Sequence, residues 1–250
     1  QWLIPSNENK DKVSNYSMDF DGMDDYIDCG VISALQSTAN FSVSCWLKVP
    51  DFSATNNFFL GSYTSGSNTI YAAVRSTQGL LFNINNTYNA YSPATLVANQ
   101  WHNVVLVFDG GINEIVTYID GVASGPGGAP ASTGTSTANL HIGNITTNYF
   151  EGNIDEFAIY DYSLTAAEAL AIGGTVPTDL SLLATPPTNY YKMGEEATFS
   201  GGVWTVPDAV GANDGSSVNM TIEDRIGEAP NSTNNALSLN MDEVDRTTDV

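Results

Sequence analysis

Two adjacent carboxylates, Asp155 and Glu156, stand at the head of an apolar run that follows Gly152. Neighbouring acids can serve as the acid and base of glycoside hydrolysis, as ligands of a metal ion, or as hydrogen-bonding groups of a strand. Successive residues of a strand point to opposite faces of the sheet, so these two side chains should not act together on one glycosidic bond. The pair alone therefore does not predict a hydrolase.

Other catalytic signals are weak. His102 and His141 each lie inside an apolar, strand-like run, where a histidine more often serves packing or the surface than catalysis. The residue types alone do not exclude a Ser-His-Asp catalytic triad. The sequence contains no H-E-x-x-H, phosphate-loop or C-x-x-C motif. These observations favour a protein that is not an enzyme.

The charge of the chain limits its partners. Seven Lys and Arg residues face 28 Asp and Glu residues among 250, which gives a net charge of -21. Such a chain repels phosphate backbones and anionic headgroups, so nucleic acid and bare membrane are poor partners. Divalent cations and neutral glycans remain plausible partners. The acidity also has a plain interpretation, which is solubility.

Localisation signals are also absent from the sequence. No apolar run reaches the length of about 18 residues that a transmembrane helix needs. The chain opens on Gln1 without a signal peptide, which we expect of a processed form or of a protein that never used that route.

Cys29 and Cys45 both fall in predicted strands, and we favour buried free thiols over a disulfide.

Short apolar runs separated by Gly, Asn, Asp and Pro predict many strands. Residues 41–48 alternate between two faces, whereas residues 101–109 are apolar on both faces, which favours a central strand. Asp120-Gly121 between two apolar runs predicts a tight hairpin. Trp46 and Trp101 should both be largely buried.

One helix is predicted, over residues 166–172. Thr165 and Glu168 have the spacing of a capping box, and Gly173 follows the last helical residue. About ten strands followed by one short helix favour an all-β fold, an antiparallel β-sandwich. We assign this sandwich to residues 1–175.

The composition and the apolar pattern of the chain change after the helix. Residues 176–187 contain Pro186-Pro187 and are predicted to be a linker. Residues 188–250 form a C-terminal extension with short strand candidates. A weak internal repeat aligns residues 16–28 with residues 237–249, and four matched positions in such Asp-rich segments are only suggestive.

Four sequence blocks resemble the laminin-G-like, concanavalin-A-like sandwich family across about residues 13–175. They read MDFDGMDDYIDCG, FSVSCWLKV, NQWHNVVLVFDGG with VTYIDGV, and LHIGN with YFEGNIDEFAIYDYSLTAAEALAI. The resemblance implies two curved antiparallel sheets in a jelly roll, frequent calcium, an extracellular or virion location, and adhesion or glycan binding. Hydrolases of this fold carry an E-x-D-x-E or E-x-D-x-x-E run, which this sequence lacks. Residues 190–216 resemble the opening of another such module.

Calcium is the predicted cofactor. If Phe157 and Ile159 face the core, strict alternation places Asp155 on the same side, where a carboxylate needs a partner or a cation. The resemblance implies that Asp155 meets the turn near the N-terminus, with oxygens from Asp21 or Asp24. The alternative is that Asp155 caps backbone N–H groups and that the turn is merely solvated.

Aromatic residues in predicted loops are the candidates for stacking on a sugar. They are Tyr63, Tyr88, Tyr91, Tyr149 and Phe150. Aromatic and Asn-rich loops suit neutral glycans, and they also suit ordinary loops and protein interfaces.

The sequence therefore favours a non-enzymatic recognition or adhesion module on an extracellular or virion surface, which binds a glycan with help from structural calcium. The alternative is a structural subunit, such as a capsid-decorating, tail-appendage or filament protein. Residues 188–250 bear on this choice, because a partial module exposes strand edges that must be covered. They can add strands to their own sandwich or to a neighbouring copy, and the sequence slightly favours the neighbour, which would give a homo-oligomer.

Overall fold

Alternating apolar and polar residues form two antiparallel β-sheets, whose apolar faces pack against each other. The computed structural model describes residues 14–63, 69–134, 137–174 and 176–230. The first sheet, sheet A, contains β1 (Ser17–Asp21), β3 (Asn40–Lys48), β8 (Trp101–Asp109), β9 (Glu114–Ile119), β10 (Val122–Ala123), β11 (Gly127–Gly128), β15 (Glu151–Tyr160), β16 (Asn189–Tyr191) and β20 (Arg225–Ile226). The predicted antiparallel β-sandwich is thereby confirmed.

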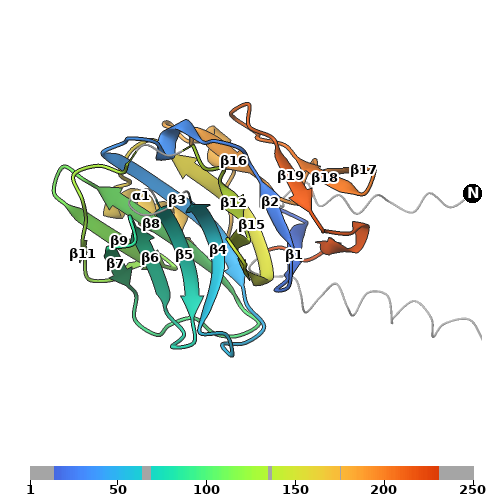
Figure 1. Ribbon diagram of the computed structural model, residues 1–250, viewed down its shortest axis with the longest axis horizontal. Helices are drawn as coiled ribbons and strands as arrows, with labels where there is room; N and C mark the ends of the chain where they lie inside the picture. The colour runs from blue at the N-terminus through green and yellow to red at the C-terminus, as the bar shows by residue number, and fades with distance from the viewer. Residues whose placement is uncertain (1–13, 64–68, 135–136, 175, 231–250) are drawn as a thin grey trace, which may run out of the picture.

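The second sheet, sheet B, has the strand order β17-β18-β19-β2-β12-β4-β5-β6-β7. Its strands are β2 (Tyr26–Asp28), β4 (Asn56–Tyr63), β5 (Thr69–Arg75), β6 (Leu80–Ile84), β7 (Tyr88–Tyr91), β12 (His141–Ile142), β17 (Thr198–Ser200), β18 (Val203–Val206) and β19 (Gly215–Val218). Figure 1 shows β17 to β19 at one end of the molecule and β7 and β11 at the other. A separate hairpin joins β13 (Asn144–Ile145) to β14 (Asn148–Tyr149).

The main core lies between the two sheets. Its largest fully buried side chains include phenylalanines from both sheets, among them Phe20, Phe41, Phe59, Phe82 and Phe108. Cys29 and Cys45 are buried there as free cysteines, as expected. Removal of this much aromatic surface from water is the main force that holds the sheets together.

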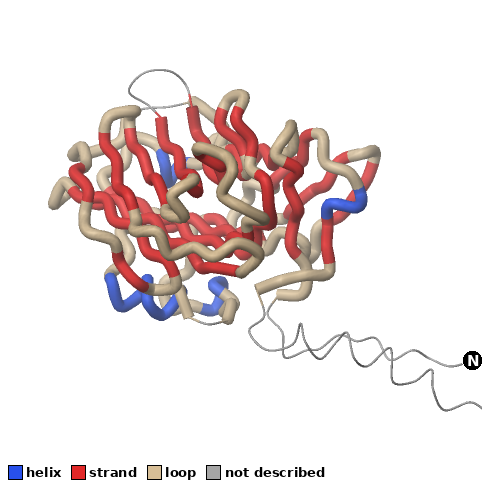
Figure 2. Tube along the Cα trace, turned by 90° about the horizontal axis from the view of Figure 1, so that it is seen from below, coloured by secondary structure: helices blue, strands red, loops and turns tan. Residues whose placement is uncertain are grey.

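A second, smaller core covers the outer side of sheet A. There Val105, Tyr160 and Tyr190 pack against Leu164 and Ile172 at α1 (Ala166–Ile172), the one α-helix among the described residues. Figure 2 shows helical segments outside the layers of strands. The remaining helical turns of the described chain are the 3-10 segments η1 (Ser33–Leu35), η2 (Leu180–Leu182) and η3 (Ile222–Asp224).

Two local predictions are confirmed by the structure. The Glu168 N–H donates to Thr165 Oγ1 at 3.2 Å, and the Thr165 N–H donates to Glu168 Oε2 at 2.8 Å, which completes the capping box of α1. Asp120 and Gly121 have φ values of 50° and 75°, as the tight turn between β9 and β10 requires. Trp46 is buried as expected, at 5% exposure, whereas Trp101 is only partly buried.

The C-terminal extension pairs with strands of its own chain. β16 pairs with β15 and β20 pairs with β1, and both thereby extend sheet A. The strands β17, β18 and β19 continue sheet B from β2. For the described residues up to 230, the structure therefore differs from the expectation that these strands are added to a neighbouring copy. The repeat segment 237–249 lies outside the described residues.

The predicted linker, residues 176–187, is packed against the sandwich in this structure. Leu180 of η2 is buried in the second core, and Asp179 caps η2 by accepting from the Ser181 N–H at 3.0 Å. Lys192 Nζ lies 2.9 Å from Asp179 Oδ2. These contacts place the start of the extension directly beside β15, where β16 can pair with it.

Candidate functional site

A β-bulge determines where the adjacent acids of β15 point. The pairing of β15 with β3 shifts register between Asp155 and Ala158, and Glu156 has a φ of 51°, which is uncommon for a residue with a side chain. Ile154 and Phe157 both lie in the main core. The extra residue between them leaves Asp155 and Glu156 together on the outer side of sheet A. The prediction of opposite faces is wrong, because it assumed uninterrupted alternation.

Buried hydrogen bonds hold both of these acids. Ser14 Oγ donates to Asp155 Oδ2 at 2.6 Å, and the Glu156 N–H donates to Asp155 Oδ1 at 2.9 Å. Tyr190 Oη donates to Glu156 Oε2. Burial, followed by the charge of Glu156, raises the pKa of Asp155 well above its usual value. Burial, followed by the charge of Glu195, raises the pKa of Glu156 in the same way. These two carboxyl groups fix Ser14 and β16 to β15.

The predicted metal set of Asp21, Asp24 and Asp155 is not brought together. Asp155 is fully buried beneath Ser14 on the outer side of sheet A, whereas Asp21 and Asp24 belong to the turn between β1 and β2. The residue that joins Asp21 and Asp24 is Asp25, and one carboxylate oxygen from each of the three lies within 4.8 Å of the others. The prediction that Asp155 is a metal ligand is therefore wrong, and Asp155 is a structural residue.

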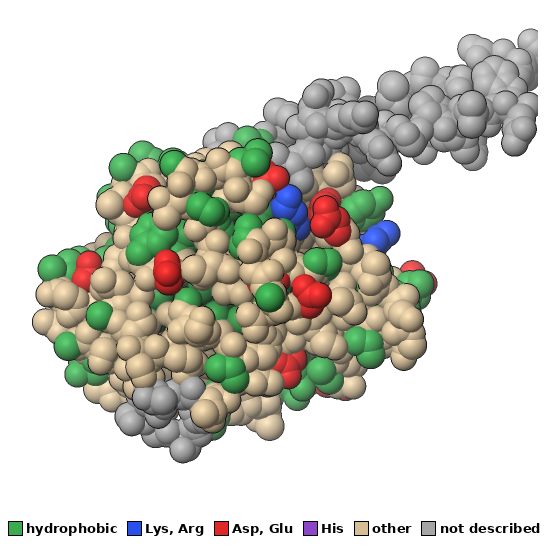
Figure 3. All heavy atoms as spheres, turned by 90° about the horizontal axis from the view of Figure 1, so that it is seen from above, with side chains coloured by type: hydrophobic (Ala, Val, Ile, Leu, Met, Phe, Trp, Pro, Cys, Tyr) green, Lys and Arg blue, Asp and Glu red, His purple; other side chains and the backbone are tan. Residues whose placement is uncertain are grey.

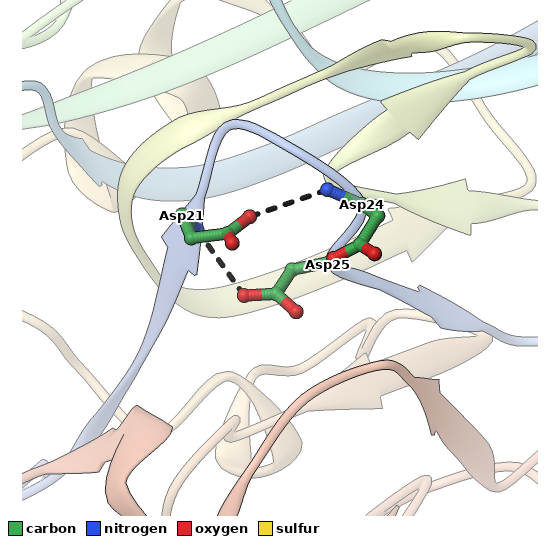
Figure 4. Close-up of side chains that lie close together, drawn as sticks. All are labelled: Asp21, Asp24 and Asp25. Carbon is green, nitrogen blue, oxygen red and sulfur yellow. Dashed lines mark hydrogen bonds between the residues drawn. The ribbon is translucent and has the colours of Figure 1, made fainter.

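The three acids of this turn face one another (Figure 4). The Asp21 N–H donates to Asp25 Oδ2 at 3.2 Å, and the Asp24 N–H donates to Asp21 Oδ1 at 3.3 Å. Burial, followed by the charges of Asp21, Asp224 and Asp24, raises the pKa of Asp25 to about 6, although its bond from the Asp21 N–H opposes that rise. Carboxylate oxygens gathered this closely are a suitable ligand set for Ca²⁺.

His102 is fully engaged in structural bonds. Its Nε2 accepts from the Val97 N–H at 3.0 Å, and its Nδ1 lies 2.7 Å from Asp120 Oδ2. Asp120 also accepts from the Asn103 N–H at 2.9 Å. Because both ring nitrogens are occupied, His102 fixes the β9–β10 turn rather than serving as a base.

A cavity of about 300 Å³ opens on the outer side of sheet B. Leu60 and Ile142 point into the main core, so their neighbours Gly61 and His141 face outward into the cavity. A Cβ at Gly61 would lie 2.3 Å from the Asn144 carbonyl oxygen, so glycine permits the β13–β14 hairpin to lie directly on β4. The hairpin forms one wall of the cavity.

Aromatic and amide side chains dominate this cavity. They include Tyr26, Tyr63, Tyr149, Asn139, His141 and Asn144. The rings of Tyr26 and His141 lie 4.6 Å apart between centroids, and His141 Nδ1 lies 3.1 Å from Asn144 Oδ1. Asn139 Nδ2 donates to Asp28 Oδ2 at 2.9 Å. The flat rings can stack on the C–H face of a sugar, and the polar groups can bond to hydroxyls.

The predicted stacking residues divide into three groups. Tyr63 and Tyr149 line the cavity. Tyr88 and Tyr91 lie on β7, at the far edge of sheet B, and Arg75 lies 4.7 Å from the centre of the Tyr91 ring. Phe150 is fully buried, in edge contact with Phe20 and Phe59 in the main core. The prediction that Phe150 binds a ligand is therefore wrong.

Sequence reasoning selected Tyr63 and Tyr149 and missed the other polar residues that line the cavity, among them Tyr26, Asn139, His141 and Asn144. Tyr26 was not selected and His141 was assigned to packing or the surface, because single-strand patterns do not show which outward side chains become neighbours. The pairing of His141 with Asp28 brings β12 and β2 together across more than a hundred residues. The one local signal was the stretch Asn139–Asn144, which is rich in amides and carries a histidine.

The family follows from the sequence match together with this fold. Residues 21–169 match the laminin-G-like family described as the concanavalin A-like lectin/glucanases superfamily, and this chain belongs to that family. No curated protein matches the chain in sequence. None of the helices in the described part of the chain is long and apolar enough to span a membrane.

Three solved structures are similar in fold. A candidate carbohydrate-binding protein from Bacteroides ovatus has a TM-score of 0.62 at 18% identity, over 87% of this chain and 62% of that one. The heptameric SAP-like pentraxin of Limulus polyphemus has a TM-score of 0.57 at 14% identity, over 79% and 94%. The Ruminococcus gnavus IT-sialidase CBM40 bound to α2,3 sialyllactose has a TM-score of 0.55 at 15% identity, over 63% and 96%. This chain thus spans less than two thirds of the Bacteroides protein.

Proposed function

We propose that this chain is a glycan-binding module without catalytic activity, and that the cavity beneath the β13–β14 hairpin is its binding site. One observation carries the proposal: three tyrosines and several amide or imidazole groups converge on an outward-facing cavity of about 300 Å³. That volume lies at the lower end of the range of small-ligand sites. The similar folds of a candidate carbohydrate-binding protein and of a CBM40 support the same class of ligand.

The residues with catalytic potential support a non-enzymatic role. Asp155 and Glu156 are buried on the opposite outer side of the sandwich, and His102 uses both of its ring nitrogens for structural bonds. A general acid or base must reach the substrate within hydrogen-bonding distance. None of these three groups lines the cavity.

Calcium is the proposed structural cofactor. Asp21, Asp24 and Asp25 would hold the ion in the turn between β1 and β2, where their oxygens already lie close together. The ion would neutralise charges that now repel one another, and it would fix the turn that connects sheet A to sheet B. None of the three acids lines the cavity, although Tyr26, which directly follows Asp25, does.

The proposed setting is an extracellular or virion surface, where a module of this kind meets glycans and serves adhesion. The alternative proposal, a structural subunit that assembles through its extension into a homo-oligomer, is less well supported. It relied on strands donated to a neighbouring copy, and β16 to β20 pair within one chain. Light scattering of the purified protein tests this alternative directly.

A glycan array tests the proposed function, with binding read for the wild-type protein and for three variants. Tyr63→Ala and Tyr149→Ala should lose signal, because each removes a ring from the cavity. Tyr91→Ala is the matched control, since this exposed tyrosine lies on the far strand β7 of the same sheet. Loss of binding in the control alone, or no binding by any form of the protein, would refute the proposal.

A further inference from the structure

Charge is distributed unevenly around the proposed binding cavity. Among its described lining residues there is no Lys or Arg. The sequence from 56 to 74, which includes β4, and the sequence from 121 to 150, which includes β12 to β14, contain no Asp, Glu, Lys or Arg. These two stretches therefore bring no formal charge to the cavity, whereas the stretch around Tyr26 brings only acids, which are Asp24, Asp25 and Asp28. On the face drawn in Figure 3 most side chains are likewise uncharged.

The cations of the described chain are committed elsewhere. Lys48 pairs with Glu228 at 2.5 Å and Lys192 pairs with Asp179 at 2.9 Å. Arg75 lies over the Tyr91 ring at 4.7 Å, at the far edge of sheet B. Arg225 lies over the Tyr16 ring at 4.6 Å. The other three cations, Lys10, Lys12 and Arg246, belong to residues that the structure does not describe.

The formal charge nearest to the cavity wall is negative. Asp28 accepts from Asn139 Nδ2 at 2.9 Å and from the Gly30 N–H at 2.8 Å, and its Oδ2 lies 4.0 Å from His141 Nε2. Asn139 and His141 both line the cavity. A ligand carboxylate or sulfate placed there would meet a like charge and no described Lys or Arg, and the net charge of -21 adds repulsion at longer range.

We infer that this site selects uncharged glycans and excludes sialylated, sulfated and uronic acid-bearing ones, an inference that rests on the proposed function. Stacking on tyrosine and hydrogen bonding to amides need no ligand charge. Recognition of a sugar acid requires a cation or a set of aligned N–H donors. The chain thus shares its fold with a CBM40 bound to sialyllactose and takes a different class of glycan.

The test is an array on which each neutral oligosaccharide stands beside its sialylated counterpart, followed by titration calorimetry on the best pair. The neutral member should bind at least ~10-fold more tightly, because like charges oppose only the sialylated member. This difference should shrink when NaCl is raised, since salt screens the repulsion and leaves stacking unchanged.

A cation added to the cavity should reverse the exclusion. Thr146 lines the cavity, is exposed and has a φ of 57°, so Thr146→Lys replaces a β-branched residue where such a residue is strained. T146K should gain affinity for the sialylated member, whereas the uncharged control T146Q should not. Asp28→Asn should weaken the exclusion in the same direction.

The outcomes distinguish failure of this inference from failure of the proposed function. Equal or tighter binding of sialylated glycans by the wild type, abolished by Tyr149→Ala, would overturn the inference and leave the proposed function intact. A silent array, or binding that neither Tyr63→Ala nor Tyr149→Ala reduces, would overturn the proposed function and the inference together. Neutral-only binding with a salt-dependent difference supports both.

Discussion

The two outer faces of this sandwich differ in how they use polar residues. On sheet A the acids Asp155, Glu156 and Glu195 are covered by Ser14, Tyr190 and the N-terminal backbone. On sheet B the polar and aromatic groups Tyr63, Asn139 and Tyr149 line an open cavity and carry no charge. The acid pair of the first face stands out in the sequence, whereas most residues of the cavity on the second face do not.

This difference shows that solvent exposure decides whether a polar side chain can bind a ligand. A buried carboxyl group can form hydrogen bonds only inside the protein, and the bonds that it forms there make it a structural part. A partly exposed tyrosine or amide retains bonding capacity for a ligand. The acid pair of β15 therefore attaches the extension, and the uncharged cavity is the place for recognition.

Replacement of a large side chain on the covered face should have the largest effect on stability. Cys45 and Leu47 point into the main core, so Trp46 faces the outer side of sheet A beside Asp155, its partner in β15. Trp46→Ala should lower the free energy of unfolding by ~3–5 kcal/mol, because it leaves a cavity among buried neighbours.

Urea denaturation measures that loss, with Tyr63→Ala on the open face as the comparison. Tyr63 is 46% exposed, so its removal should change stability by less than about 0.5 kcal/mol. Equal losses in the two variants would remove the distinction between a structural face and an open face.

Calcium should have the next largest effect, through the turn between β1 and β2. At 10 to 100 times the dissociation constant, an ion that binds only the folded chain adds about 1.4–2.7 kcal/mol. Asp25→Asn should abolish the rise in melting temperature on adding calcium, since Asp25 belongs to the ligand set. Asp155→Asn should retain that rise, because Asp155 bonds to Ser14.

The calcium response is read by differential scanning calorimetry with calcium and with chelator. A wild-type protein that melts at one temperature in both conditions contradicts the calcium proposal. A response lost in Asp155→Asn and kept in Asp25→Asn would instead restore the ligand that strict strand alternation predicted.

Tyr26 tests whether the cavity of the open face is the binding surface, because sequence reasoning did not select this residue. Its ring lies 4.6 Å from that of His141 inside the cavity. Tyr26→Ala should weaken glycan binding by about tenfold, which corresponds to about 1.4 kcal/mol of lost stacking and contact. Tyr88→Ala, at a residue that the sequence did select, should leave affinity unchanged, because β7 lies at the far edge.

Calorimetric titration with one glycan that the array identifies measures both variants. If Tyr88→Ala weakens binding and Tyr26→Ala does not, the binding surface lies on the outer strands of sheet B and the cavity is incidental.

Local signals predicted the fold well. Alternation in residues 41–48, the Asp120-Gly121 turn and the Thr165–Glu168 capping box each act over a few residues, and the structure forms all three. Such signals depend on backbone geometry that neighbouring residues alone determine. The sandwich could therefore be predicted before its strand order was known.

The candidate site was predicted only in part, since it depends on long-range pairing and on one irregularity. The bulge at Glu156 has no distinctive residue, yet it moves Asp155 to the other face of sheet A. Phe150 is separated from Tyr149 by a single peptide bond, and one is buried while the other lines the cavity. The route of the extension likewise depends on unpaired edges of β15 and β2, which no local pattern reveals.

The smallest effect should come from Glu156→Gln, and its sign depends on pH. At pH 4 the variant should unfold within about 1 kcal/mol of the wild type, since an amide oxygen can accept the Tyr190 hydroxyl as the carboxyl group does. Burial and the charge of Glu195 raise the pKa of Glu156 in the folded state. Between the ordinary and the raised pKa the folded chain binds more protons than the unfolded chain, so wild-type stability falls as pH rises.

Glu156→Gln carries no titrating group at this position, so it should lose less stability than the wild type between pH 4 and pH 8. Glu168→Gln is the opposite control: bonds from the Thr165 N–H and hydroxyl lower the pKa of this exposed carboxyl, whose contribution is present at neutral pH and is lost as pH falls. Urea midpoints across this pH range measure both variants. If the wild type and Glu156→Gln lose stability in parallel, Glu156 does not ionise at a cost, and the acids of the covered face are not distinguished from ordinary surface acids.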